Sequence, residues 1–458
     1  MSLAIDPHEP NGVKQHLKPN MHQLAWLVLW ASFGLFFVFC ASSTFSIYHF
    51  VFRSTVPLGG VIAVAKGAVG IVHNDLSESF ELDQSVIARG DQVITDSQSQ
   101  AVLNFRNDET QNLVAVVTVK GNSILVVRGG LQPRFGWSIR PYTITLEAIQ
   151  GDFDIFIPET LNRPNGVNVQ IKLPQNTLVD IRNAGRHHLV INEQTIQLNT
   201  DSGQAAMLDL EDDVSQSVGR GQMIVFDRES RNLLQLVGYE NLVSEYDLAA
   251  LPVQGDMPTT LMNSWNCDDR SPESTRSTFI SMILDNRNVI ELLRGGNARS
   301  HGETRCVQPF GPSAQTGLLL ENYDYLDIRA TFYIESHSLD LCGDKGSECP
   351  LMLLMDYIDT EGRSNQWFHG FYTTLEARRD YPASCVSCQE PHERINNQEW
   401  YTYESGNLFR LLPDRTPASI LNLRFYASGH EYRLFVDEVS LRALNHETFD
   451  LIQTIEGN

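Results

Sequence analysis

Residues 112–130 read NLVAVVTVKGNSILVVRGG, two short valine-rich runs separated by a Lys-Gly-Asn-Ser turn. β-branched residues favour strands, and glycine beside asparagine is typical of the tight turns that join them. Comparable runs follow one another about every ten residues from Val56 to about Leu242, and helical periodicity is nearly absent there. The sequence therefore predicts an all-β domain over residues 56–243.

Part of this region is more specific than its periodicity. Its features are, in order, a Gly60-Val61 start, a Gly90-Asp91 pair, the short strand 93–95, the small-residue strand 101–103 and Phe105. This order resembles the FecR-type domain, and residues 171–227 are similar to the second half of that family. The resemblance implies a membrane-anchored relay in which an extracytoplasmic sensor controls a sigma factor through a cytoplasmic tail.

An apolar segment precedes this domain. No Asp, Glu, Lys or Arg lies between Lys18 and Arg53. A helix over residues 23–52 would exceed the roughly 30 Å of a bilayer's hydrocarbon core. A cleaved signal peptide is the alternative, but the apolar run is about twice the usual length of a signal-peptide core. We expect one transmembrane helix.

The flanking charges predict the orientation of this helix. Lys14 and Lys18 precede it, whereas only Arg53 closely follows it. Positive charge favours the cytoplasmic side. The chain would then be a single-pass protein of the cell membrane. Residues 1–22 would form its cytoplasmic tail, and the bulk of the chain would be extracytoplasmic. That tail is too short to fold into a sigma-binding domain, so the relay role does not follow from the fold alone.

The net charge of −22 bears on the class of partner. Such a surface repels phosphate backbones, so we expect no nucleic-acid partner. Solubility accounts for this acidity without a specific cationic ligand.

A second domain is predicted after a linker over residues 244–263, which contains Pro252, Gly255 and Pro258. Strand patterns again dominate residues 264–446, and a short tail, residues 447–458, would follow. The number and spacing of the strands suit a two-sheet jelly roll.

Three stretches of this second domain resemble the galactose-binding-like jelly rolls, the fold of many carbohydrate-binding modules. They are residues 289–310 with a His301-Gly302 turn, the central strand 323–334, and the closing strand 432–444 with Asp437 near its middle. The resemblance implies a fold and leaves the ligand open, because such units also serve as adhesion or spacer modules.

Six of the seven cysteines fall in this second domain, in a region predicted to be exported. An even number there indicates disulfides. Six cysteines permit 15 connectivities, of which sequence order gives the simplest. It pairs Cys267 with Cys306, Cys342 with Cys349, and Cys385 with Cys388.

The last of these pairs lies in a Cys-x-x-Cys stretch followed by His392. A zinc site or a redox dithiol is the alternative to a structural disulfide. Zinc would need two further ligands, and a redox dithiol would need a helix N-terminus, whereas Pro382 and Pro391 favour a loop.

Aromatic residues supply candidate ligand-binding residues. Trp367, Trp400 and Tyr403 could stack on sugar rings, with Arg363 and Glu404 donating or accepting the orienting hydrogen bonds. Asn365 is a further donor of this kind. The alternative is that these rings belong to the hydrophobic core.

No catalytic motif accompanies the carboxylate pairs Asp324 and Asp327, Asp356 and Asp359, or Asp437 and Glu438. We expect no enzyme and no cofactor, with Asp437 as a candidate ligand of a structural calcium ion. The sequence predicts a non-catalytic protein that recognises a glycan or an envelope protein, with signal transmission open. A structural or assembly role in the cell envelope is the alternative.

Overall fold

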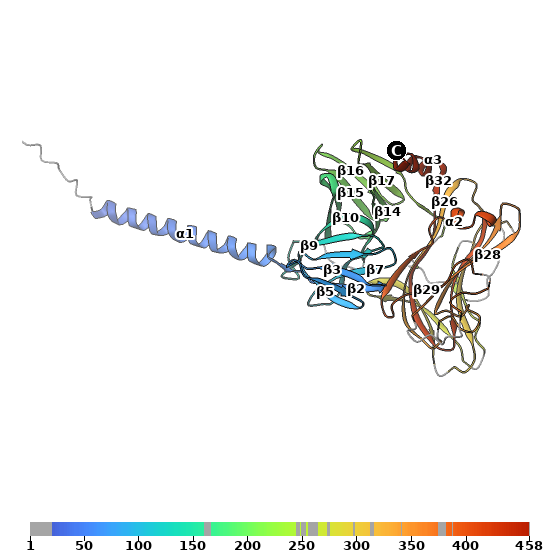
Figure 1. Cartoon of the computed structure of the whole chain (residues 1–458). Coiled ribbons are helices and arrows are strands. Elements are labelled where there is room, and N and C mark those ends of the chain that lie inside the picture. Colours follow the sequence, from blue (N-terminus) through green and yellow to red (C-terminus); the bar gives the residue numbers. More distant parts are fainter. Residues whose placement is uncertain are drawn as a thin grey trace, which may run out of the picture. The chain divides into compact units, whose positions relative to one another are not determined.

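The computed structural model describes residues 21–159, 166–243, 248, 253–254, 264–272, 275–295, 298–311, 316–339, 341–373, 382–386 and 388–457. The chain divides into two compact units. One comprises residues up to Thr55 together with Pro133–Arg140. The other comprises Val56–Gln132 and Pro141–Asn458. The fold is mostly β with one apolar N-terminal helix, as the sequence predicts (Figure 1).

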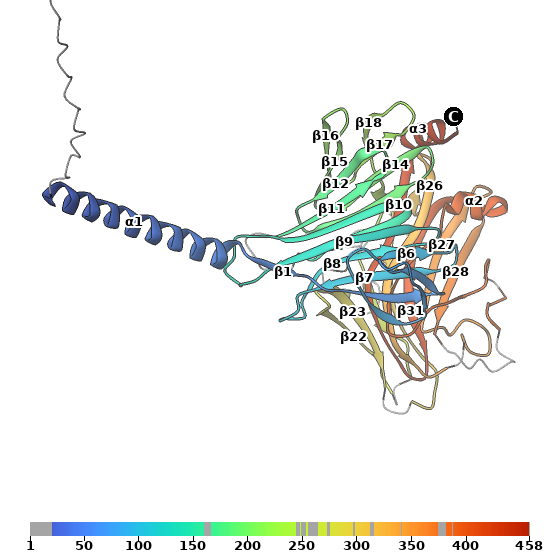
Figure 2. The same ribbon diagram turned by 60° about the vertical axis from the view of Figure 1, so that its left-hand side comes forward.

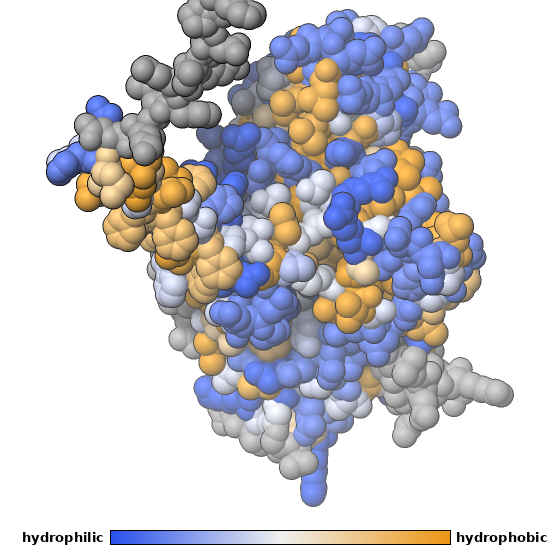
Figure 3. Space-filling view, turned by 90° about the vertical axis from the view of Figure 1, so that its left-hand side faces the viewer, coloured by the Kyte–Doolittle hydropathy of each residue, from blue (hydrophilic) through white to orange (hydrophobic). Residues whose placement is uncertain are grey.

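Helix α1, Met21–Arg53, contains the predicted membrane segment. Its 33 residues have a mean hydropathy of 2.2 over the most apolar window, and none of that window is buried. By length and composition it could span a membrane or act as a signal sequence. Figure 3 colours residues by hydropathy on one face, where hydrophilic side chains cover much of the β region. The predicted cytoplasmic tail lies almost wholly outside the described residues.

Eighteen short strands, β1 to β18, form the first β domain. They are β1 Thr55–Pro57, β2 Gly60–Lys66, β3 Val69–Val72, β4 Glu78–Glu81, β5 Gln84–Ile87, β6 Gln92–Thr95, β7 Gln100–Arg106, β8 Leu113–Val119, β9 Ile124–Pro133, β10 Tyr142–Ile157, β11 Val167–Leu173, β12 Thr177–Ile181, β13 Gly185–Ile191, β14 Thr195–Ser202, β15 Gln204–Asp209, β16 Val214–Gly219, β17 Gln222–Asp227 and β18 Asn232–Val237.

Seventeen of these strands, β2 to β18, form two sheets that share β10. One sheet has the order β4-β3-β6-β9-β10-β11-β12-β15-β16. The other has the order β5-β2-β7-β8-β10-β13-β14-β17-β18. Figure 2 shows β10 between β9 and β11. A continuous apolar core lies between the two sheets.

Strand β10 changes sheets at Gly151. Its first half pairs with β9 as far as Gln150, and its second half pairs with β13 from Gly151 onward. Gly151 has φ 115°, and a Cβ atom there would lie 2.1 Å from Ser123 Oγ. Only glycine fits this bend. Gly90 likewise has a positive φ, 98°, at the turn before β6. Asp91 Oδ2 accepts a hydrogen bond from the Ala88 nitrogen in this turn.

The second β domain contains the remaining strands and two short helices. They are β19 Glu240–Asn241, β20 Val253–Gln254, β21 Asn266–Asp269, β22 Thr278–Leu284, β23 Arg287–Arg294, β24 Gly302–Pro309, β25 Leu318–Leu319, β26 Tyr323–His337, β27 Leu351–Asp359, β28 Ser364–Tyr372, β29 Glu393–Arg394, β30 Trp400–Glu404, α2 Leu408–Leu411, β31 Pro417–Gly429, β32 Tyr432–Asn445 and α3 His446–Gly457.

Two sheets face each other in this domain, as a jelly roll requires. The six-stranded sheet has the order β22-β23-β32-β26-β30, with β19 on β32. The eight-stranded sheet has the order β20-β21-β24-β31-β27-β28-β29, with β25 on β31. The residues predicted as a C-terminal tail instead form α3, because Ile452 packs against Leu444, Met223 and Val225.

The outer face of the six-stranded sheet packs against the first β domain. Gln100 donates from Nε2 to the Thr402 backbone oxygen (2.8 Å) and accepts from the Thr402 nitrogen (2.9 Å). Ala65 and Val102 of the first domain lie in the same apolar cluster as the core of the second. The two β domains therefore form one compact unit, and most of the predicted linker between them lies outside the described residues.

Charged side chains fill the centre of this contact. Lys120 Nζ lies 3.1 Å from Asp152 Oδ1 and 3.1 Å from Asp154 Oδ2. It also lies 2.9 Å from Glu404 Oε1 of the second domain. Arg329 lies 2.9 Å from Asp154 and 3.1 Å from Glu404. Burial alone would lower the pKa of Lys120, but these carboxylates raise it above its usual value.

A second cluster continues the contact. Asp437 is fully buried, and its carboxylate oxygens lie 2.7 Å from Arg186 Nη2 and 2.5 Å from Arg287 Nη1. Both guanidinium groups also lie over the ring of Phe156, at 4.6 and 4.4 Å from its centroid. Although burial raises the pKa of Asp437, the two arginines hold it below its usual value.

We call these charges the interdomain ion-pair network. Its members are Lys120, Asp152, Asp154, Arg186 and His188 of the first domain and Arg287, Asp327, Arg329, Glu404, Asp437, Glu438 and Arg442 of the second. Within this network six carboxylates face five lysine or arginine cations and one histidine. The charge is close to balanced, which is the condition under which ions tolerate burial.

Asp437→Asn should destabilise the protein strongly, because it leaves Arg186 and Arg287 buried without their anion. Removing one partner of a buried ion pair costs about 3–5 kcal/mol. Urea unfolding followed by circular dichroism measures the loss. Asp344→Asn, at an exposed turn, is the matched control. Equal stability of the two variants would contradict the importance of the network.

Glu393 links stability to pH. Burial raises its pKa, but hydrogen bonds from His369, Lys66 and Tyr401 lower it from 4.5 to about 2. Because the folded pKa is depressed, this stabilisation is present above pH 4.5 and is lost as the pH falls toward about 2. The shift corresponds to about 3 kcal/mol. The difference in unfolding free energy between wild type and Glu393→Gln should therefore shrink on acidification. A difference that stays constant with pH would contradict this account.

Candidate functional site

The outer face of the eight-stranded sheet is the face of the jelly roll that the first β domain leaves open. Leu351, Leu353 and Met355 of β27 lie in the core between the two sheets. Successive side chains alternate across a strand, so Met352, Leu354 and Asp356 point outward. The corresponding face of the other sheet is occupied by the interdomain contact.

Polar side chains lie at two places on this outer face. Asp356 lies opposite Gln366 on β28 and opposite Asn422 on β31. Gln366 Nε2 donates to Asp356 Oδ1 (2.6 Å), and Arg424 Nη2 donates to Asp356 Oδ2 (2.9 Å). Toward the other edge, Arg305 Nε donates to Asp268 Oδ1 (2.8 Å). Between these two polar places the face is apolar, because Met352, Leu354 and Tyr426 form a buried cluster with the Cys342–Cys349 disulfide.

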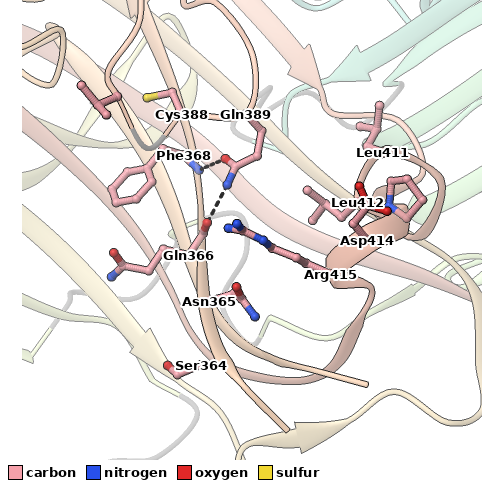
Figure 4. A pocket seen from close by; sticks show the side chains of 12 residues that line it. Ser364, Asn365, Gln366, Phe368, Cys388, Gln389, Leu411, Leu412, Asp414 and Arg415 are labelled. Carbon is pink, nitrogen blue, oxygen red and sulfur yellow. Dashed lines mark hydrogen bonds between the residues drawn. The ribbon is translucent and has the colours of Figure 1, made fainter. Parts of the chain in front are cut away.

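A groove of about 780 Å³ lies along β28 at one side of this face (Figure 4). Its lining comes from three segments: Ser364, Asn365, Gln366 and Phe368 of β28; Val386, Cys388 and Gln389 of the loop before β29; and Leu411, the last residue of α2, with the following residues to Arg415. Figure 4 shows the Arg415 side chain extending toward Gln366 and Asn365. Amide, guanidinium and apolar groups converge there, the combination that recognises polar ligands with apolar faces.

Gln389 covers the free edge of β28 beside the groove. Its Nε2 donates to the Gln366 backbone oxygen (2.8 Å), and its Oε1 accepts from the Phe368 nitrogen (3.2 Å). An amide side chain therefore takes the place of a neighbouring strand. It satisfies a sheet edge that would otherwise be open to pairing with another chain.

Two disulfide loops meet beside this edge. Cys342 is bonded to Cys349 and Cys385 to Cys388. A Cβ atom on Gly346 of the first loop would lie 2.4 Å from the Ser384 oxygen of the second, so the loops are in close contact. The third disulfide joins Cys267 to Cys306, which lie opposite each other on β21 and β24. All three pairs agree with the sequence-order prediction.

His392 holds the two loops together. Its Nδ1 accepts from the Gly370 nitrogen (3.0 Å), and its Nε2 donates to the Gly346 oxygen (2.6 Å). Burial lowers the pKa of His392, which keeps the ring neutral in this arrangement. Both ring nitrogens are thus engaged by the backbone. The Cys-x-x-Cys stretch forms a disulfide within a loop, which favours a structural role over a zinc or redox site.

The structure places most of the predicted sugar-stacking rings in the core. Trp367 is 2% exposed, and Trp400 and Tyr403 are 6% exposed. Tyr403 stacks on His369 inside the jelly roll with ring centroids 4.6 Å apart, and Trp400 donates from Nε1 to Asp285 (3.1 Å). Buried rings offer no face to a sugar, so the expectation of stacking on these three residues is corrected.

The predicted polar ligand residues divide between two places. Glu404 and Asp437 belong to the interdomain ion-pair network, and the neighbours of Asp437 are arginines rather than the oxygen donors that calcium requires. Arg363 is half-exposed beside the groove, and Asn365 lines it. Of the predicted ligand residues, Asn365 thus lines the groove and Arg363 lies next to it.

Sequence reasoning missed Gln366, Gln389 and Arg415. Alternation along β28 carries a signal for Gln366, because it follows the opposite face from Trp367. Gln389 and Arg415 lie in loops, where no periodicity exists to place them.

The carboxylate pairs considered for acid–base chemistry are held by cations or turns. Asp327 accepts from Arg442, Asp356 from Arg424, and Asp437 from Arg186. Asp359 caps its own turn, where the backbone nitrogens of Glu361 and Arg363 donate to it.

No family model matches the chain, and no curated protein matches it. Solved structures similar to parts of it include an anti-sigma factor of Parabacteroides distasonis, at 9% identity and TM-score 0.24. That match covers 32% of this chain and 59% of that one.

Carbohydrate-binding modules are also among the similar structures. The family 11 module of a Clostridium thermocellum cellulosomal cellulase has 12% identity and TM-score 0.23, covering 46% of this chain and 96% of its own. TmCBM61, solved with beta-1,4-galactotriose, has 8% identity and TM-score 0.22. The match covers 44% of this chain and 97% of that one.

Thiol counting tests the cysteine assignment. Under denaturing, non-reducing conditions, a maleimide reagent should modify Cys40 alone, because the other six sulfurs are paired. Intact-mass spectrometry before and after reduction gives the count. Modification of further cysteines without reduction would contradict the three disulfides.

Proposed function

We propose that the chain is a membrane-anchored, extracytoplasmic and non-catalytic receptor that binds a glycan in the groove beside β28. One observation carries the proposal. The first β domain occupies the outer face of the six-stranded sheet, so the outer face of the eight-stranded sheet, with the polar groove beside β28, is left for a ligand.

The composition of the groove supports a glycan. Gln366, Asn365 and Arg415 supply donors and acceptors for hydroxyl groups, and Phe368 with Leu411 supplies apolar surface for the C–H faces of a sugar ring. Amides and a guanidinium group orient a ligand through several hydrogen bonds, each of modest energy.

The end of helix α1 supports an anchor over a cleaved signal sequence. The Ile139 nitrogen donates to the Phe52 oxygen (3.1 Å), and the Arg134 nitrogen donates to the Ser54 oxygen (3.1 Å). These bonds join the helix to a hairpin of the exported domain. Removal of the helix would leave the hairpin without these partners.

An assembly role in the envelope is the second candidate. Val386 and Leu411 are exposed apolar residues at the rim of the groove, and such residues also suit a protein partner. In either case the two β domains keep one relative arrangement, because the interdomain ion-pair network holds them together.

Retention on a panel of immobilised polysaccharides tests the receptor proposal, using the full chain in detergent micelles. Gln366→Ala and Arg415→Ala should each weaken retention about tenfold, the effect of losing a hydrogen bond of about 1.5 kcal/mol. Gln216→Ala at a half-buried position and Arg182→Ala at an exposed position, both in the first β domain, are the matched controls.

Two outcomes would overturn the glycan proposal. One is the absence of retention on every polysaccharide, which favours the assembly role. The other is retention that the groove variants and the controls share equally. Circular dichroism of each variant excludes loss of fold as the cause.

A further inference from the structure

The connection between β9 and β10 forms a compact unit with the end of helix α1. We call residues 133–140, PRFGWSIR, the helix-end hairpin. Phe135 packs against Phe50 of the helix with ring centroids 5.7 Å apart, and Trp137 stacks on Phe135 at 5.3 Å. The Arg134 guanidinium lies 5.3 Å from the centroid of the Phe50 ring. An aromatic cluster thus surrounds the last turn of the helix.

Backbone bonds fix the hairpin to this turn. The last carbonyl groups of any helix lack partners within the helix. Here the Phe52 oxygen accepts from the Ile139 nitrogen (3.1 Å) and from Ser138 Oγ (2.8 Å). The Ser54 oxygen accepts from the Arg134 nitrogen. The hairpin therefore lies at the level of residues 50–54, whatever the position of the other unit.

The exposed groups of the hairpin are apolar, aromatic or basic. Trp137 is 63% exposed and Ile139 is 47% exposed. Arg134 and Arg140 are exposed as well, and Arg53 ends the helix. These groups belong to a chain with a net charge of −22, yet no Asp or Glu lies between residues 109 and 147 or between residues 53 and 75.

We propose that the helix-end hairpin binds the headgroup layer of the bilayer that α1 spans, as a second membrane contact. This inference rests on the proposed anchor. A helix of 33 residues is about 50 Å long, whereas hydrocarbon and headgroups together span about 40–45 Å. The last turn of α1 therefore reaches the headgroup layer, and the hairpin bonded to it reaches the same depth.

The chemistry of the hairpin suits this layer. Tryptophan concentrates at membrane interfaces, where its ring is apolar and its N–H remains hydrated. Arginines attract anionic lipid headgroups and are repelled by a cationic surface. A protein partner would not require both the exposed aromatic ring and a position at the end of a membrane helix. We therefore infer that the hairpin binds lipid.

Quenching by brominated lipids tests the proposal on the full chain in lipid nanodiscs. Trp26→Phe and Trp30→Phe remove the helix tryptophans from the starting protein, and Trp265, Trp367 and Trp400 are buried. Lipids brominated near the headgroup should then quench the emission of Trp137, whereas lipids brominated near the end of the acyl chain should not. Trp137→Phe should abolish that quenching.

A matched variant places the same fluorophore elsewhere. Trp137→Phe combined with Phe37→Trp moves the ring to the middle of α1, where bromine near the lipid chain end should quench it and bromine near the headgroup should not. Arg134→Gln with Arg140→Gln should reduce the quenching of Trp137 in anionic nanodiscs. The same dependence on bromine depth at positions 137 and 37, or no quenching at 137, would overturn the proposal.

Membrane flotation separates this failure from failure of the anchor. If the anchor is wrong, the cellular protein has lost α1 by intact mass and does not float with vesicles. If it floats with α1 intact while Trp137 is not quenched, the anchor stands and the headgroup contact is overturned.

Discussion

Burial of charge between the two β domains is the constraint on which the rest of the structure depends. A purely apolar contact could slide, whereas a buried ion pair loses its compensation when either partner moves. Lys120, Asp154 and Arg329 meet across the interface within hydrogen-bonding distance, so the domains have one relative arrangement. That arrangement occupies one face of the jelly roll and leaves the opposite face open, which determines where a ligand groove can lie.

The sequence predicted the elements better than the contacts between them. Valine-rich runs and glycine turns placed the strands, and the absence of charge placed α1. Asp152 and Asp154 alternate with Phe153 and Ile155 along β10, a pattern that describes equally a face in water and a face against another charged sheet. The two faces differ in whether Arg329 and Glu404 lie against the aspartates, and these two residues are far along the chain. In the same way, period two separated Trp367 from Gln366 without showing which of them was core.

One strand links the features at the two ends of the first domain. β10 begins directly after the helix-end hairpin, crosses from one sheet to the other at Gly151, and then carries Asp152 and Asp154 into the interdomain ion-pair network. In sequence, β9 and β10 lead directly into and out of the helix-end hairpin, whose backbone is hydrogen-bonded to the end of α1.

The distance in sequence between the network's partners has a consequence for biogenesis. Arg186 meets Asp437 across 251 residues, and Asp154 meets Arg329 across 175. When a polypeptide is exported from its N-terminus, the earlier charges emerge long before the later ones. Until then they remain hydrated, and the two β domains can dock only after the later charges have been synthesised.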